Sequence, residues 1–116
     1  MKITRLYTGE GGHSYFEDYE PAFELKEPLG LFTRPIPAKA VFFREIKPGY
    51  TYPWHTVLCR EYVVTLSGSA EVEVSSGEKR RFKKGDTLLV EDMKGKGHRT
   101  RCTSRTPWRQ IFITLP

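Results

Sequence analysis

Histidines, a glutamate and two cysteines are the residues of this sequence that could carry acid-base or metal chemistry. In an extended strand alternate side chains share one face, so His55 and Cys59 would lie on one side, and Glu61 can rejoin that side after a turn. By the same rule His98 and Cys102 share a face of the segment "HRTRC". If both segments face the interior of one barrel, these side chains converge.

Two chemistries follow from such a cluster. Imidazole and carboxylate ligands from His55, Glu61 and His98 suit a divalent metal such as iron, manganese, nickel or zinc. Without a metal, His55 would act as general acid or base, with Glu61 orienting it. Simpler roles stay open: a hydrogen-bonded interior His55, a Glu61 paired with Arg44 or Arg60, and an exposed His98 after the Gly-Lys-Gly loop.

The elements that would position these residues are strands. Proline and glycine recur at short intervals and leave little room for a helix of ordinary length. Between them lie β-branched and aromatic runs, for example "AVFFREI", "EYVVTL", "TLLVED" and "WRQIFITL". The alternation in "SAEVEVSSGEKRRF" predicts a hairpin with its turn at "SSGE". We expect an all-β domain, an antiparallel barrel or sandwich of about six to ten strands with almost no helix.

The spacing around His55 resembles the first motif of the cupin family of double-stranded β-helix (jelly-roll) barrels. Gly49, His55, Glu61 and Gly68 match that motif in their order and spacing, while Val57 stands where a second histidine is usual. The resemblance implies a cupin-like jelly-roll fold, and a metal site that lacks one of its four ligands.

A second cupin motif is matched more loosely. Gly85 opens it and His98 corresponds to its histidine, but "EDMKGKG" replaces the usual Pro-x-Gly and Cys102 stands in place of asparagine. The resemblance covers residues 40–115, and residues 1–39 are expected to form N-terminal edge strands and loops of the same single domain, 1–116. The chain is also similar to a group of short single-domain bacterial cupins that are mostly uncharacterised.

Four further residues are candidates for ligand contact. Arg44 could face inward with Phe42 and Ile46, and a buried arginine without a carboxylate favours an anionic ligand. Tyr52 and Trp54 flank His55 and could wall the mouth of a pocket, although core or dimer packing is the more ordinary role. Cys102 is the fourth. Both cysteines are expected to be reduced thiols that fill small apolar spaces.

The expected function is binding of a small, anionic metabolite, with possible isomerase, epimerase, dehydratase or oxygenase activity through a metal or through His55. The alternative is a non-catalytic small-molecule-binding or sensor barrel without metal. The sequence selects neither a substrate nor a reaction.

Charge and hydropathy limit the partners. Residues 79–116 hold eleven Lys and Arg against three Asp and Glu, which could steer an anion or simply form a solvated face. Nucleic-acid binding is disfavoured because no reader motif is present. No apolar run approaches the roughly 20 residues that span a membrane, and no signal peptide is evident, so we expect a cytoplasmic protein. Apolar faces such as "IFITL" predict a homodimer.

Overall fold

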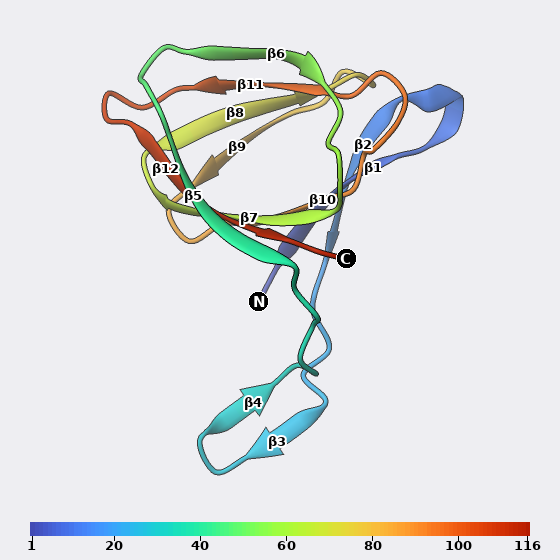
Figure 1. The fold of residues 1–116 in the computed structure, drawn as a ribbon, viewed down its shortest axis with the longest axis vertical. Helices are drawn as coiled ribbons and strands as arrows, with labels where there is room; N and C mark the ends of the chain where they lie inside the picture. The colour runs from blue at the N-terminus through green and yellow to red at the C-terminus, as the bar shows by residue number, and fades with distance from the viewer.

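The computed structural model describes residues 1–116 and consists almost entirely of strands (Figure 1). Its only helical element is a three-residue 3-10 turn, Glu10–Gly12, and no helix is present that could span a membrane. The strands are β1 Ile3–Thr8, β2 Ser14–Tyr19, β3 Leu25–Glu27, β4 Gly30–Phe32, β5 Ala40–Ile46, β6 Thr51–His55, β7 Glu61–Ser67, β8 Ser69–Val74, β9 Lys79–Lys83, β10 Thr87–Val90, β11 His98–Cys102 and β12 Trp108–Thr114.

Two sheets enclose the interior of the barrel. One has six strands in the order β2-β1-β10-β7-β12-β5, and the other has four in the order β6-β11-β8-β9. Strands β5 and β6 are consecutive in the chain but are edge strands of different sheets. The sheets face each other across the barrel in Figure 1. This is the all-β jelly-roll arrangement that the sequence predicts.

Alternation along the strands produces the core. In β8, Ala70, Val72 and Val74 are buried, while Glu71 and Glu73 point toward solvent. β8 pairs with β9 in the hairpin that the sequence predicts. The main core gathers inward-facing apolar side chains from both sheets, namely Leu6, Phe16, Val63, Val72, Val74, Phe82, Leu88, Val90 and Phe112.

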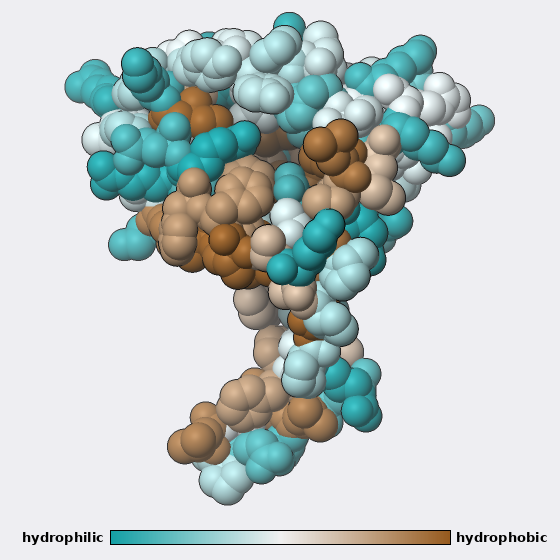
Figure 2. All heavy atoms as spheres, in the orientation of Figure 1, coloured by the Kyte–Doolittle hydropathy of each residue, from teal (hydrophilic) through white to brown (hydrophobic).

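The third sheet is a projecting hairpin, in which β3 pairs only with β4. It belongs to residues 20–38, which we call the arm. Figure 1 shows the arm extending away from the barrel on a narrow neck, and Figure 2 shows apolar side chains on its surface. Here the strands exceed the expected number, because ten form the barrel sheets and two more form the arm.

Two other expectations are corrected. The barrel is not wholly antiparallel, because β1 pairs in parallel with β10. The N-terminal residues do not supply edge strands alone either, since β1 lies inside the six-stranded sheet between β2 and β10, and Leu6 is fully buried. Sequence patterns report local alternation, whereas a parallel pairing between strands about eighty residues apart depends on the whole topology.

Gly68 allows the chain to pass from β7 in one sheet to β8 in the other. Its φ is +73°, and a Cβ there would overlap the Pro107 carbonyl oxygen. Gly85 also has a positive φ, +89°, but a Cβ there would meet nothing within 4 Å.

We therefore expect Gly68→Ala to lower the free energy of unfolding by clearly more than Gly85→Ala. The control substitution carries only the left-handed backbone cost of about 1–2 kcal/mol, whereas Gly68→Ala adds a steric clash with backbone. Urea denaturation of both variants measures the difference. Equal losses for the two variants would contradict this role for Gly68.

Candidate functional site

Side chains from both sheets line a small cavity in the barrel, of about 40 Å³. We call it the barrel pocket. Its volume has room for a few water molecules or for the head group of a ligand, but not for a whole metabolite. Its lining residues are Arg44, His55, Val57, Glu61, Val63, Val72, Leu88, Val90, His98, Thr100, Trp108 and Phe112.

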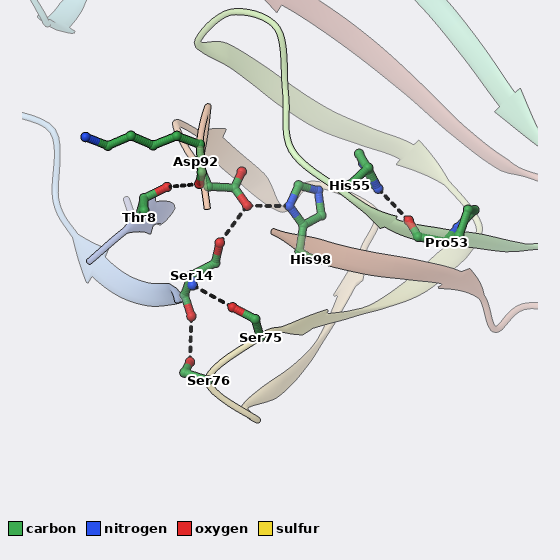
Figure 3. A network of polar contacts seen from close by, with 9 residues as sticks. Thr8, Ser14, Pro53, His55, Ser75, Ser76, Asp92 and His98 are labelled. Carbon is green, nitrogen blue, oxygen red and sulfur yellow. Dashed lines mark hydrogen bonds and ion pairs between the residues drawn. The ribbon is translucent and has the colours of Figure 1, made fainter. Parts of the chain in front are cut away.

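His98 is held in the barrel pocket by a buried carboxylate (Figure 3). Its Nδ1 lies 2.6 Å from Oδ2 of Asp92, and the same oxygen accepts a hydrogen bond of 2.8 Å from Ser14 Oγ. Asp92 and Ser14 have no solvent exposure. Because an ionised carboxylate only accepts hydrogen bonds, the proton of a neutral His98 stays on Nδ1 and Nε2 keeps a free lone pair.

His55 lies directly opposite His98 in the pairing of β6 with β11. The centroids of the two rings are 4.3 Å apart. His55 Nδ1 donates to the carbonyl oxygen of Pro53 at 2.7 Å, which fixes the ring. Burial lowers the pKa of the His55 imidazole below its usual range, and the nearby His98 adds to this effect. His55 is therefore neutral near pH 7.

Arg44 brings a cation to the same pocket. Its Nε donates to Oε1 of Gln110 at 2.8 Å, and its guanidinium lies 4.5 Å from the ring centroid of Phe112. Burial lowers the pKa of Arg44, and Glu61 opposes that shift through space. No carboxylate is close enough to Arg44 to form an ion pair.

Glu61 is half-buried at the start of β7, and it also lines the pocket. Burial raises the pKa of its carboxyl group, while Arg44 lowers it to a smaller extent. Glu61 does not orient His55, because the partner of His55 Nδ1 is the Pro53 carbonyl. The histidine oriented by a carboxylate is His98, and that carboxylate is Asp92. This corrects the pairing expected from the sequence.

The structure thus brings together four of the predicted residues, Arg44, His55, Glu61 and His98. Tyr52 stands beside them, with its ring centroid 4.3 Å from that of His55 in an edge-on contact. It is partly exposed and does not line the cavity.

Trp54 and Cys102 are placed elsewhere. Trp54 is exposed and lies under the guanidinium of Arg99, on the outside of the barrel. Cys102 faces inward, but it packs in a separate cluster with Ile46, Ala70 and Trp108. It lies four residues from His98, a rise of about 13 Å along a strand. Neither residue lines the barrel pocket, so the structure does not place them with the other predicted site residues.

Asp92 and Gln110 are functional candidates that the sequence reading missed. Leu88 and Val90 line the pocket, so period-two alternation continued past the end of β10 would have pointed to Asp92. Gln110 occupies an inward position of β12, between the buried Trp108 and Phe112. Buried polar atoms without partners remain on both, at Asp92 Oδ1 and Gln110 Nε2.

The barrel pocket does not fit a divalent metal as its side chains stand. No three His, Cys, Asp or Glu side chains in residues 1–116 form a group that could hold a metal ion. Val57 lines the cavity where the family motif has its second histidine, and the Arg44 guanidinium lies in the same space. A second cation there is opposed by Coulomb repulsion at short range.

Comparisons with known proteins identify relatives in sequence and neighbours in structure. No protein-family model matches the chain. Phomopsin biosynthesis cluster protein D from Diaporthe leptostromiformis is 32% identical over 93 residues, which are 78% of this chain and 46% of that protein. Oryzines biosynthesis cluster protein J from Aspergillus oryzae is 34% identical over 82 residues, 69% of this chain and 44% of that protein. The chain therefore spans less than half the length of these curated relatives.

Several solved structures of bacterial proteins have a similar architecture. A protein with a double-stranded beta-helix domain from Klebsiella pneumoniae has a TM-score of 0.55 at 21% identity, over 66% of this chain and 65% of that one. A cupin 2 conserved barrel domain protein from Salinispora arenicola has a TM-score of 0.54 at 20% identity, over 66% and 61%. The polyketide cyclase RemF from Streptomyces resistomycificus has a TM-score of 0.52 at 16% identity, over 71% and 69%.

Because these solved structures are at most 21% identical to the chain, the likeness to them concerns the fold. The curated relatives are from fungi, so the expected similarity to bacterial cupins in particular is not confirmed. The strand order and these neighbours agree with each other on the fold. The chain therefore has the cupin fold, a double-stranded β-helix.

Proposed function

We propose that the barrel pocket binds the anionic head group of a small molecule through Arg44, and that His98 transfers a proton on the bound molecule. The observation that carries the proposal is the half-buried guanidinium of Arg44, which has no carboxylate partner. Removing a cation from water without a counter-ion is unfavourable. An anionic ligand would supply the missing charge.

Gln110 adds a second donor without an acceptor. Its Oε1 accepts the hydrogen bond from Arg44 Nε, and its Nε2 is buried with no partner. Of these two groups only the guanidinium lines the pocket, and the Gln110 amide lies behind it as its hydrogen-bond partner. A carboxylate has two oxygens that accept hydrogen bonds and can satisfy donors of this kind.

The opposite wall supports proton transfer. With Nδ1 donating to Asp92, His98 has Nε2 free as a base, and Figure 3 shows this second nitrogen on the side of the ring toward His55. Glu61, whose pKa is raised by burial, is suited to return a proton. Such a pair serves isomerase, epimerase and dehydratase types of reaction, in which a proton moves near a carboxylate.

The size of the pocket limits the ligand. A cavity of about 40 Å³ would hold the head group only, so the rest of the molecule would extend past Tyr52 toward solvent, or the side chains would move apart. The relatives' names, which refer to the biosynthesis of phomopsin and oryzines, support a role in small-molecule biosynthesis. The alternative, binding without turnover, is supported by the same small volume.

Loss of the Arg44 charge should weaken anion binding. We expect Arg44→Gln to weaken the binding of small carboxylates such as acetate, glycolate and malonate at least tenfold, about 1.4 kcal/mol. Nuclear magnetic resonance of the imidazole protons is the measurement, because saturable shifts should occur at His55 and His98 and not at His13.

The matched control is Arg109→Gln. Arg109 lies on the outside of β12 and pairs with Glu45 at 2.8 Å, so this variant loses the same charge outside the pocket. It should bind carboxylates like wild type. Unchanged carboxylate affinity in Arg44→Gln would contradict the proposed anion-binding role of Arg44.

The Asp92 carboxylate should determine the tautomer of His98. An asparagine at position 92 can donate to Nδ1 as well as accept from it, so Asp92→Asn should raise the population of the Nε2–H tautomer, in which Nε2 is no longer a base. Nitrogen-15 chemical shifts of the imidazole report this ratio directly. Asp86→Asn, at a surface turn where Asp86 caps the Lys83 amide, is the control. A wild-type tautomer ratio in Asp92→Asn would show that the carboxylate does not set the proton position.

Replacing Val57 should reveal how close the pocket is to a metal site. We expect wild type to bind Zn²⁺ or Ni²⁺ weakly and Val57→His to bind at least tenfold more tightly, because a third imidazole would join His55 and His98. Leu58→His is the control, since Leu58 is fully exposed on the adjacent loop. Titration calorimetry measures the affinities. Equal affinities in the two variants would mean that position 57 does not share a metal-binding geometry with the histidines.

A further inference from the structure

The arm carries apolar side chains that nothing in the chain covers. Leu29 at its tip is 93% exposed. Phe23, Leu31, Phe32 and Ile36 are exposed as well. Figure 2 shows brown and tan spheres, the colours of apolar residues, on the projecting hairpin. Isolated two-stranded hairpins are marginally stable in water, and each strand of this one has only three residues. The arm therefore needs a surface to pack against.

An apolar groove lies where the arm meets the barrel, with a volume of about 630 Å³. Phe23, Leu31 and Ile36 of the arm form one wall. Tyr62 and Val64 of β7 belong to the other, together with neighbouring residues of the six-stranded sheet. The groove and the barrel pocket are separate sites, because they share no lining residue.

The outer face of the six-stranded sheet continues the same apolar surface. Ile113 of β12 lines the groove and pairs with Val41 of β5, while Ile111 pairs with Phe43. Val41 is exposed, and Phe43 is 72% exposed. β5 is an edge strand with an unpaired side, which is the kind of edge that soluble proteins usually protect.

We propose that a second copy of this chain covers these surfaces, with the arm of each copy packed into the groove and against the outer sheet face of the other. The chain itself carries both complementary parts, a projecting apolar segment and an apolar groove beside its base. A two-fold axis lets both contacts form at once and closes the assembly, because each copy gives one arm and receives one.

The available area is sufficient for a stable dimer. The exposed apolar side chains of the arm and of β5 amount to on the order of 800 Å² per copy, which is the amount that each partner buries in an interface of standard size. Of the five charged side chains in the arm, Arg34 and Glu24 form an ion pair with each other at 2.5 Å. This inference is independent of the ligand proposed for the barrel pocket.

The test is the mass in solution, measured by light scattering at micromolar concentration. Wild type should have the mass of a dimer, and the double variant Leu29→Asp, Leu31→Asp should have that of a monomer. Leu58→Asp makes the same kind of change at an exposed leucine outside the proposed contact, and it should leave the dimer intact. Circular dichroism of each variant verifies that the barrel is folded.

A mixing experiment identifies the surfaces that meet. Val64→Asp alters the groove and leaves the arm intact, so it too should be monomeric. Mixed with the arm variant, it should form a mixed dimer, because one intact arm then meets one intact groove. A monomeric wild type, or an arm variant that remains a dimer, would overturn the proposal. Failure of two folded monomeric variants to associate would overturn the exchange of arms.

Discussion

Asp92 has a carboxylate with no solvent exposure, and a charge in that position is tolerated only if polar neighbours replace the water that it has lost. His98 and Ser14 both donate to its Oδ2, and its backbone carbonyl accepts from the amide of Val57 at 3.2 Å. These contacts join β11, β2 and the loop after β6 at a single residue. The buried carboxylate therefore fixes one wall of the pocket and ties the N-terminal strands to the four-stranded sheet.

Different interactions hold His98 at one end of the pocket and Arg44 at the other. At one end, the His98 ring is held in place because its Nδ1–H donates a hydrogen bond to the buried carboxylate of Asp92. At the other, Arg44 is held by one amide and by the faces of Phe112, Trp108 and Tyr52, contacts that position a guanidinium without neutralising it. Arg44 is a cation without a counter-ion, and His98 is a base whose proton position is fixed. An anionic molecule in the pocket would therefore be oriented with its anionic group at Arg44.

Strand alternation explains both what the sequence could predict and where it failed. Arg44, His55, Glu61 and His98 converge because each occupies an inward position on a regular strand or at its end. Strict alternation already places Trp54 on the face opposite its neighbour His55, so the expectation for Trp54 was at odds with its own strand pattern. Tyr52 shares the side of His55 because β6 is irregular: His55 is paired with His98 but Tyr52 with Thr100, so three residue steps on β6 match two on β11. Bulges and the partners of a buried carboxylate depend on long-range pairing, which one sequence does not reveal.

β5 links the pocket to the outer surface of the molecule. Arg44 and Phe43 are adjacent on this strand, and alternation turns the first toward the pocket and the second toward solvent. β5 is hydrogen-bonded only to β12. Arg44, the residue proposed to bind the anion, therefore lies on an edge strand. A partner packed on Val41 and Phe43 would restrict the motion of this strand, and a less mobile β5 would hold the Arg44 guanidinium in place for a ligand. Because a preordered side chain loses less conformational entropy on binding, the two surfaces of one strand would be thermodynamically coupled even though they share no residue.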